Sequence, residues 1–237
     1  MQNAARRKAS ALLLDTFWPN RCDCCEERIP YDLLICPECE ALLQAQRITY
    51  TDWATHHSTM PWDGGAVLFS YEKAAKTGIL AVKDGHRGFA EYAGVLLAEE
   101  LKSCCPPEQI SCITWVPVTK RRKRQQGYAH TELLARAAAA ALGRPLRSDL
   151  LAEHAGKIRQ HDLPAAERKK YAERFTATDR RTDGLSIVLV DDILTTGNTL
   201  RRCTEELRRQ GAARVWIAAV CATIHPDRAA SAGTDCL

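Results

Sequence analysis

The feature that most constrains this 237-residue chain is a buried strand, a helix and a second buried strand within residues 187–221. Residues 187–190 are apolar throughout, as in a strand covered on both faces. Residues 215–221 form the next apolar run. Between the runs, apolar or small residues recur at helical spacing, namely Leu200, Cys203, Thr204 and Leu207. A strand–helix–strand unit this short predicts two parallel strands joined by a right-handed crossover.

Further elements of the same kind precede this unit. Residues 66–71 and 112–116 have the β-prone composition of strands, and residues 131–142 are helical with Gly143 at the stop. The sequence therefore predicts an α/β fold, a parallel sheet flanked by helices, over residues 61–237. Residues 1–60 are predicted to form a smaller N-terminal part, which ends in a polar linker that begins at residue 44.

Composition limits the classes of protein to consider. A hydrophobic fraction of 46% and a charged fraction of 26% are typical of globular chains and exclude wholesale disorder. The net charge of +4 is too small to indicate a nucleic-acid partner by itself. No apolar run approaches the roughly 18 residues that cross a bilayer, and Asp15 interrupts the run at 11–14 too early for a signal peptide. We expect a short amphipathic helix there, no membrane span and a cytoplasmic protein.

Two acids and a turn rich in threonine separate the strand at 187–190 from the helix near Leu200. Ligands bind at the carboxyl ends of strands in open parallel sheets, and a helix N-terminus favours an anion. Carboxylates accept hydrogen bonds from sugar hydroxyls and hold Mg²⁺ directly or through water. The stretch predicts a joint site for a sugar diol and a phosphate; simple helix capping is the alternative. Its residues are Asp191, Asp192, Thr195, Thr196, Gly197, Asn198 and Thr199.

A run of five cations follows the predicted strand at 112–116, at the sheet edge where the turn opens. Such a run resists burial unless an anion joins it. A pyrophosphate would suit it, and so would a nucleic-acid backbone; the alternative is an exposed surface loop. The five residues are Lys120, Arg121, Arg122, Lys123 and Arg124.

Two CxxC pairs lie near the N-terminus, with ten residues between them. Each pair can direct two thiolates at one ion, and two pairs complete the tetrahedral four-cysteine site that zinc prefers. Unpaired thiols or a redox-active pair are the alternatives. Cys24 offers an alternative first ligand, although spacing favours its neighbours. The predicted ligands of this structural zinc ribbon are Cys22, Cys25, Cys36 and Cys39.

The combination of these motifs resembles the competence-associated ComF family, in which a zinc ribbon precedes a type I phosphoribosyltransferase domain. The stretch Ile187–Leu200 resembles the signature of that domain, with every position filled. Segments 13–19, 78–85 and 127–136 add to the resemblance. The chain departs from relatives at 126–130, where it has Gln-Gly-Tyr-Ala-His in place of Arg-Gly-Phe-Asn-Gln.

This resemblance implies binding of phosphoribosyl pyrophosphate (PRPP) with magnesium, and a phosphoribosyl transfer to an acceptor that the sequence does not identify. It implies that Asp191 and Asp192 bind the ribose hydroxyls and that residues 195–199 surround the 5′-phosphate. It also implies a role in DNA uptake. The alternatives are a non-catalytic module that binds single-stranded DNA, or one that docks on a partner helicase or channel.

Overall fold

The computed structural model describes residues 20–49, 54, 60–118, 127–153, 175–177 and 182–223. Within them lies a four-stranded, fully parallel sheet in the order β1-β6-β5-β2. In that order the strands are Gly65–Ser70, Arg214–Ala222, Ser186–Leu194 and Cys112–Trp115. A parallel sheet flanked by helices confirms the predicted fold class.

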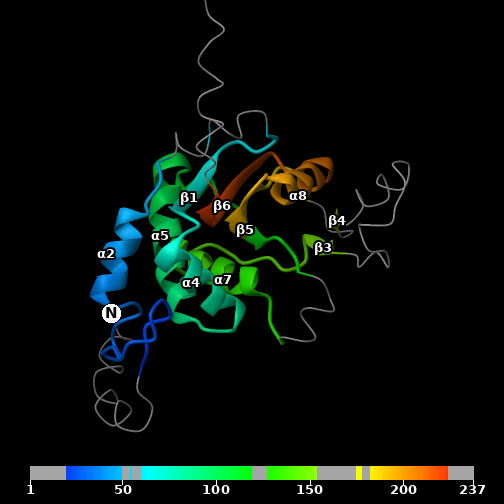
Figure 1. Cartoon of the computed structure of the whole chain (residues 1–237). Helices are drawn as coiled ribbons and strands as arrows, with labels where there is room; N and C mark the ends of the chain where they lie inside the picture. Colours follow the sequence, from blue (N-terminus) through cyan, green and yellow to red (C-terminus); the bar gives the residue numbers. More distant parts are fainter. Residues whose placement is uncertain are drawn as a thin grey trace, which may run out of the picture.

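Helices cover both faces of the sheet (Figure 1). One face carries α4, α5 and α7, which are Lys73–Lys83, Gly88–Cys104 and His130–Leu142. The other face carries α8, Asn198–Arg209. Successive residues of β5 alternate between the two layers, since Val188 packs with the first group and Leu189 with the second. The burial of β5 on both faces explains its continuous apolar run.

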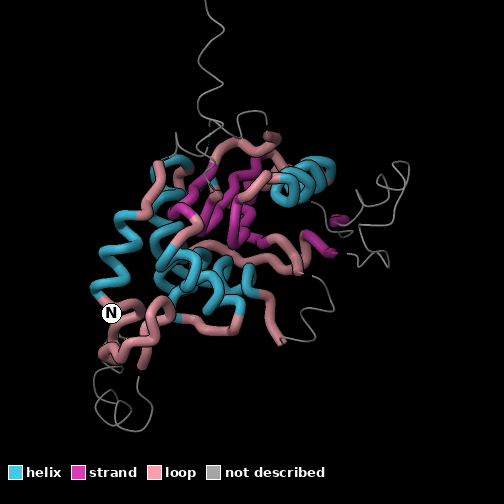
Figure 2. Tube along the Cα trace, viewed as in Figure 1, coloured by secondary structure: helices cyan, strands magenta, loops and turns pink. Residues whose placement is uncertain are grey.

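Smaller elements surround this core. Helix α2, Pro37–Ala45, lies beside α4, and the 3-10 turn η2, Pro107–Gln109, precedes β2. Strands β3 and β4, Leu151–Glu153 and Phe175–Ala177, form an antiparallel pair apart from the main sheet (Figure 2). None of the helices in the described part of the chain combines the length and the apolar character needed to cross a bilayer. The helix predicted near residue 11 lies outside the described residues.

Two boundaries differ from the sequence prediction. Strand β5 does not end at residue 190 but continues through both acids to Leu194, in register with Ala222 of β6. Helix α8 begins at Asn198, before Leu200. The sheet ladder continues past the apolar run because backbone pairing with β6 is independent of side-chain polarity. The two acids therefore lie on a rigid strand rather than in a turn.

The segment predicted as a linker from residue 44 is structured at its start. Arg47 pairs with Phe69 in an antiparallel bridge, and the Ile48 N–H donates to the carbonyl of Leu68 at 3.0 Å. The Gln46 side chain reaches the start of α4, where its Oε1 accepts from the Ala75 N–H at 3.3 Å. These residues give β1 a partner on its outer side. The domain boundary near residue 60 stays a prediction.

Candidate functional site

The two predicted acids occupy the carboxyl-terminal end of β5. Asp191 is in register with Ala219 of β6 and is only 7% exposed. Its Oδ1 accepts the N–H of Asp192 at 2.9 Å, and Asp192 Oδ1 accepts the N–H of Ile193 at 2.8 Å. These local bonds fix the orientation of both carboxyl groups at the point where α8 is about to begin.

Two cationic or protonatable side chains from other elements reach Asp192. Its Oδ2 lies 2.8 Å from Nζ of Lys83, the last residue of α4, and 3.3 Å from Nε2 of His130, the first residue of α7. The Lys83 side chain is 22% exposed and that of His130 is 6% exposed. The Nδ1 atom of His130 is buried without a hydrogen-bond partner among the described residues. Three elements thus converge on one carboxylate.

The surroundings separate the two acids electrostatically. Burial raises the pKa of Asp191 well above its ordinary value, and the charge of Asp192 adds to that rise. Burial alone would also raise the pKa of Asp192, but the hydrogen bond from His130 and the charge of Lys83 outweigh it and lower that pKa. Asp192 is therefore the anion of the pair, and Asp191 holds a proton more readily than an ordinary carboxyl group.

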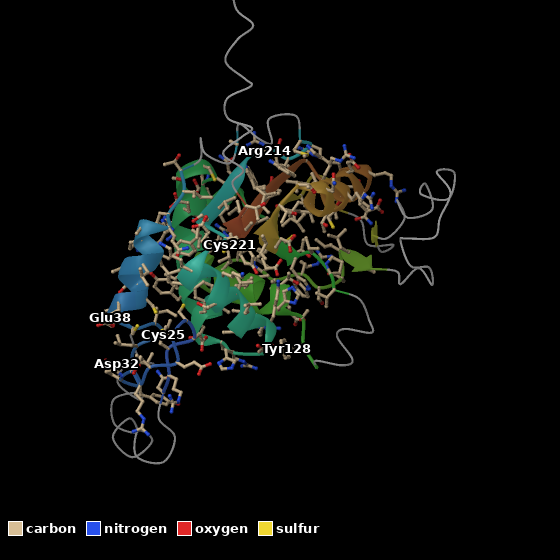
Figure 3. All side chains as sticks on the ribbon, in the orientation of Figure 1. Cys25, Asp32, Glu38, Tyr128, Arg214 and Cys221 are labelled. Atoms are coloured by element: carbon tan, nitrogen blue, oxygen red, sulfur yellow. The ribbon has the colours of Figure 1, made fainter. Side chains whose placement is uncertain are left out.

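The backbone holds Lys83 in place from the far side. The Tyr128 hydroxyl donates to the carbonyl of Lys83 at 2.7 Å. Gly85 has a φ of +100°, and a Cβ there would lie 3.0 Å from that hydroxyl, so a larger residue would press on the tyrosine. Figure 3 shows Tyr128 on the side of the molecule toward which the Cys221 end of β6 points. The cluster therefore lies at the carboxyl edge of the sheet, where α/β folds bind ligands.

The predicted phosphate turn follows directly after β5. Gly197 adopts a left-handed φ of 74°, which glycine tolerates better than other residues. It is buried, whereas Thr195, Thr196, Asn198 and Thr199 are exposed. No side chain in the described part of the chain caps the N-terminus of α8. The first amides of this helix are therefore available to an anion, which the helix dipole also favours.

Direct magnesium coordination does not fit the acid pair. Mg²⁺ requires open, anionic oxygen ligands. Both oxygens of Asp192 already have hydrogen-bond or ion-pair partners, and one of these partners is the ammonium of Lys83, which repels a cation. Asp191 is buried, and its raised pKa favours the neutral acid. The residues of the acid pair therefore do not fit a directly bound Mg²⁺ ion.

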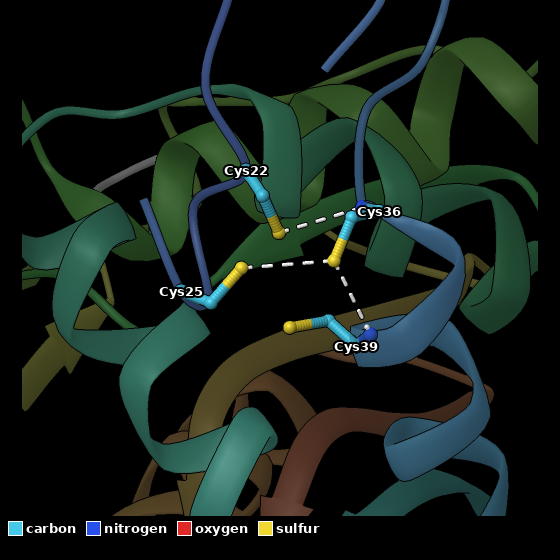
Figure 4. A group of neighbouring side chains, drawn as sticks. All are labelled: Cys22, Cys25, Cys36 and Cys39. Carbon is cyan, nitrogen blue, oxygen red and sulfur yellow. Dashed lines mark hydrogen bonds between the residues drawn. The ribbon is translucent and has the colours of Figure 1, made fainter. Parts of the chain in front are cut away.

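The four predicted zinc ligands come together in one cluster. The Sγ atoms of Cys22, Cys25, Cys36 and Cys39 all lie within 4.8 Å of one another, and the side chains point toward a common centre (Figure 4). The Cys25 and Cys36 sulfurs are 3.6 Å apart, close to the roughly 3.8 Å that tetrahedral Zn–S bonds of about 2.3 Å imply. Cys24 is not part of this cluster.

Backbone amides support the cluster. The Cys36 N–H donates to Sγ of Cys22 at 3.4 Å, and the Cys39 N–H donates to Sγ of Cys36 at 3.3 Å at the start of α2. Burial raises the pKa of Cys36 to about 11, and a bound cation would favour its thiolate instead. The donor set fits zinc. Four protein ligands leave no open position, so such an ion would be structural.

The cysteine cluster is attached to the start of α5. Asp23, between two of the cysteines, accepts the N–H of Phe89 at 2.7 Å and lies 3.2 Å from Nδ1 of His86. Its side chain is only 8% exposed. Phe89 is the second residue of α5. Asp23, although distant in sequence, therefore caps the N-terminus of this helix.

Replacing this carboxylate should weaken the whole fold. We expect Asp23→Ala to lower the free energy of unfolding by about 1 kcal/mol, because an N–H of α5 loses its acceptor and the helix dipole its anion. Urea denaturation would measure the loss. Asp32→Ala, at an exposed position of the same module, is the control. Equal stability of the two variants would contradict the capping role.

The predicted basic run lies outside the described residues. It consists of Lys120, Arg121, Arg122, Lys123 and Arg124.

Three side chains that complete the two sites were not predicted from the sequence. Lys83 and His130 belong to segments that carry the family resemblance, but no spacing rule links either of them to Asp192. Asp23 gave no signal beyond its place between cysteines. All three act through contacts between segments distant in sequence.

A family model and several curated proteins match parts of this chain. A family model described as a phosphoribosyl transferase domain matches residues 153–234, which include the acid pair and the turn. The DNA utilization protein YhgH of Salmonella typhimurium is 26% identical over 207 residues, covering 86% of this chain and 90% of that protein. The protein of the same name from Escherichia coli K12 is 25% identical over 210 residues, with the same coverage.

Solved structures give partial matches. A glutamine PRPP amidotransferase from B. subtilis is 25% identical with a TM-score of 0.40, over 54% of this chain and 25% of that one. The chain thus matches about a quarter of the amidotransferase's length. A purine phosphoribosyltransferase from Pyrococcus horikoshii is 21% identical with a TM-score of 0.37, over 56% of this chain and 73% of that one.

Proposed function

We propose that this chain, which contains a phosphoribosyltransferase-type domain, binds PRPP and transfers the phosphoribosyl group. The premise includes its homology to the DNA utilization protein YhgH of the ComF family. One observation carries the proposal. An anionic carboxylate on a rigid strand and a helix N-terminus without a side-chain cap follow each other within residues 191–199. A ribose carrying a 5′-phosphate presents hydroxyls and an anion to match them.

In the proposed reaction, the bond from the anomeric carbon of ribose to pyrophosphate breaks, and a bond to a nucleophile of the acceptor forms. The pyrophosphate leaves with its bonding electron pair, and the proton of the nucleophile passes to solvent. Asp192 holds the ribose hydroxyls, and the amides of α8 hold the 5′-phosphate, so positioning and charge complementarity supply the catalysis. Lys120 to Arg124 are proposed to hold the pyrophosphate. Any magnesium would accompany that pyrophosphate.

Titration with PRPP tests the proposal. A ligand that binds only the folded state raises the melting temperature, so PRPP should raise it in a concentration-dependent way. Mixtures of nucleobases and amines should then release pyrophosphate from PRPP if the group is transferred. A melting temperature that PRPP leaves unchanged, with and without magnesium, would contradict the binding site itself.

A second candidate is a binding module in DNA uptake that retains the pocket without turnover. The name of the YhgH relatives, which connects them with the use of DNA, favours it. This function predicts affinity for single-stranded DNA that falls steeply with salt, since phosphate contacts release counterions. Arg121→Ala together with Arg122→Ala should weaken that affinity, while Asp192→Asn should leave it unchanged. If neither DNA nor PRPP binds, docking on a helicase or channel protein is the remaining function.

A further inference from the structure

The Asp192 carboxylate has a built-in counter-cation. Its Oδ2 lies 2.8 Å from the Lys83 ammonium, and both side chains are largely withdrawn from solvent, at 13% and 22% exposure. A pair this shielded is screened less than a surface ion pair. Lys83 therefore neutralises Asp192 before any ligand arrives.

The Lys83–Asp192 pair favours binding of a sugar hydroxyl over binding of a metal ion. A hydroxyl is neutral and can donate to a carboxylate oxygen while the ammonium remains beside it, because each oxygen accepts more than one hydrogen bond. A divalent cation would have to displace Lys83 or approach against its charge. A phosphate group nearby gains from the same ammonium. The acid pair thus suits a phosphorylated sugar better than a free cation.

The position of Lys83 is fixed from several sides. His130 holds the same Oδ2 at 3.3 Å, and the Tyr128 hydroxyl anchors the Lys83 carbonyl at 2.7 Å. Lys83 ends α4, whose start is held by Gln46. Among the described residues, the charged or titratable groups at this point are Asp191 and Asp192 on β5, Lys83 on α4, His130 on α7 and the buried thiol of Cys221 on β6.

We propose that Lys83 takes the place of a divalent cation at the acid pair, so that a ribose 5-phosphate group binds there without any metal held by Asp191 or Asp192. The inference rests on the proposed phosphoribosyl pocket and deepens it, since it extends the ligand class to sugar phosphates that carry no pyrophosphate. Magnesium is then required only by ligands that bring a pyrophosphate to bind it.

Calorimetric titration with ribose 5-phosphate tests this inference without the ambiguity of a pyrophosphate-bound metal. The wild-type protein should bind it equally in excess EDTA and in magnesium. Lys83→Met, which keeps the length of the side chain but removes its charge, should bind it about tenfold more weakly, because a charge-assisted interaction is lost. Lys76→Met, at an exposed position of the same helix, is the matched control and should bind as the wild type does.

These measurements can distinguish failure of the proposed role of Lys83 from failure of the proposed phosphoribosyl pocket. Wild-type binding of ribose 5-phosphate that disappears in EDTA overturns the role of Lys83, even if Lys83→Met fails to fold. A folded Lys83→Met variant with wild-type affinity also overturns it. If PRPP binds with magnesium while ribose 5-phosphate does not bind in EDTA, the proposed function stands and this inference falls. If neither ligand binds in any buffer, both are wrong.

Discussion

We propose that the four-cysteine cluster binds zinc, so serine in place of Cys36 is expected to release the ion and to unfold the segment around residues 20–45. Three sulfur ligands cannot hold the ion as four do, and the energy of structural zinc sites is on the order of 10 kcal/mol in small zinc-binding peptides. The segment has little apolar core of its own, since its buried residues Ile35 and Leu43 share a core with Phe69 and Phe89. Metal content by atomic emission, together with circular dichroism, would measure the effect.

The neighbouring cysteine provides the control for this experiment. Cys24→Ser changes the same atoms within the same module but lies outside the cluster, so the variant should keep one zinc per chain and its stability. Cys22→Ser should behave as Cys36→Ser does. Loss of zinc from Cys24→Ser and its retention by Cys22→Ser would show that Cys24 is the first ligand.

Asparagine in place of Asp192 is expected to weaken PRPP binding by about a hundredfold. The substitution removes the anionic acceptor for the ribose hydroxyls, and hydrogen bonds to a charged group contribute about 1.5–3 kcal/mol each. It also leaves Lys83 and His130 without their shared anion. Titration calorimetry with PRPP would measure the loss.

Two matched variants make this result specific. Asp32→Asn, an exposed acid on the cysteine module, should bind PRPP normally. Asp191→Asn should have a smaller effect than Asp192→Asn, because burial already favours the neutral form of Asp191 and an asparagine has a similar shape. Equal losses in the Asp191 and Asp192 variants would contradict the division of charge within the pair.

The same variants differ in their response to pH. The pKa of Asp192 is lower in the folded protein than the roughly 3.9 of an unfolded chain, so its ionised form stabilises the fold above that pH. This contribution is lost as the pH falls through the folded-state pKa. The pKa of Asp191 is raised, so its ionisation at higher pH opposes folding instead. Denaturation of Asp192→Asn should therefore show a weaker loss of stability below about pH 4 than the wild type shows.

Local patterns in the sequence were sufficient to predict the parallel sheet and the cysteine cluster. The apolar run of β5 and the buried positions of α8, which include Leu200 and Leu207, follow from periodicity alone. The spacing of the cysteines was enough because each CxxC pair is local, the first in a turn and the second at the start of α2. Local signals did not predict α4 or the extension of β5 through its acids.

The contacts that complete the acid site could not be predicted in this way. Lys83 ends a helix that follows β1, His130 begins one that follows β2, and Asp192 is on β5. Which side chains meet depends on the order of the strands and on close helix packing, such as Gly78 against the Phe89 ring, where a Cβ would lie 2.5 Å away. Only the folded chain shows that arrangement.

Both edge strands of the main sheet, β1 and β2, form backbone hydrogen bonds with other segments of the same chain. Residues 46–48 run along β1, and on the opposite side the Arg147 N–H donates to the carbonyl of Ile113 in β2. A sheet edge that is left unpaired can pair with strands of other molecules and so promote aggregation. Residues 46–48, which follow α2, therefore cover the β1 edge of the sheet, and removal of residues 1–60 should expose that edge and promote self-association.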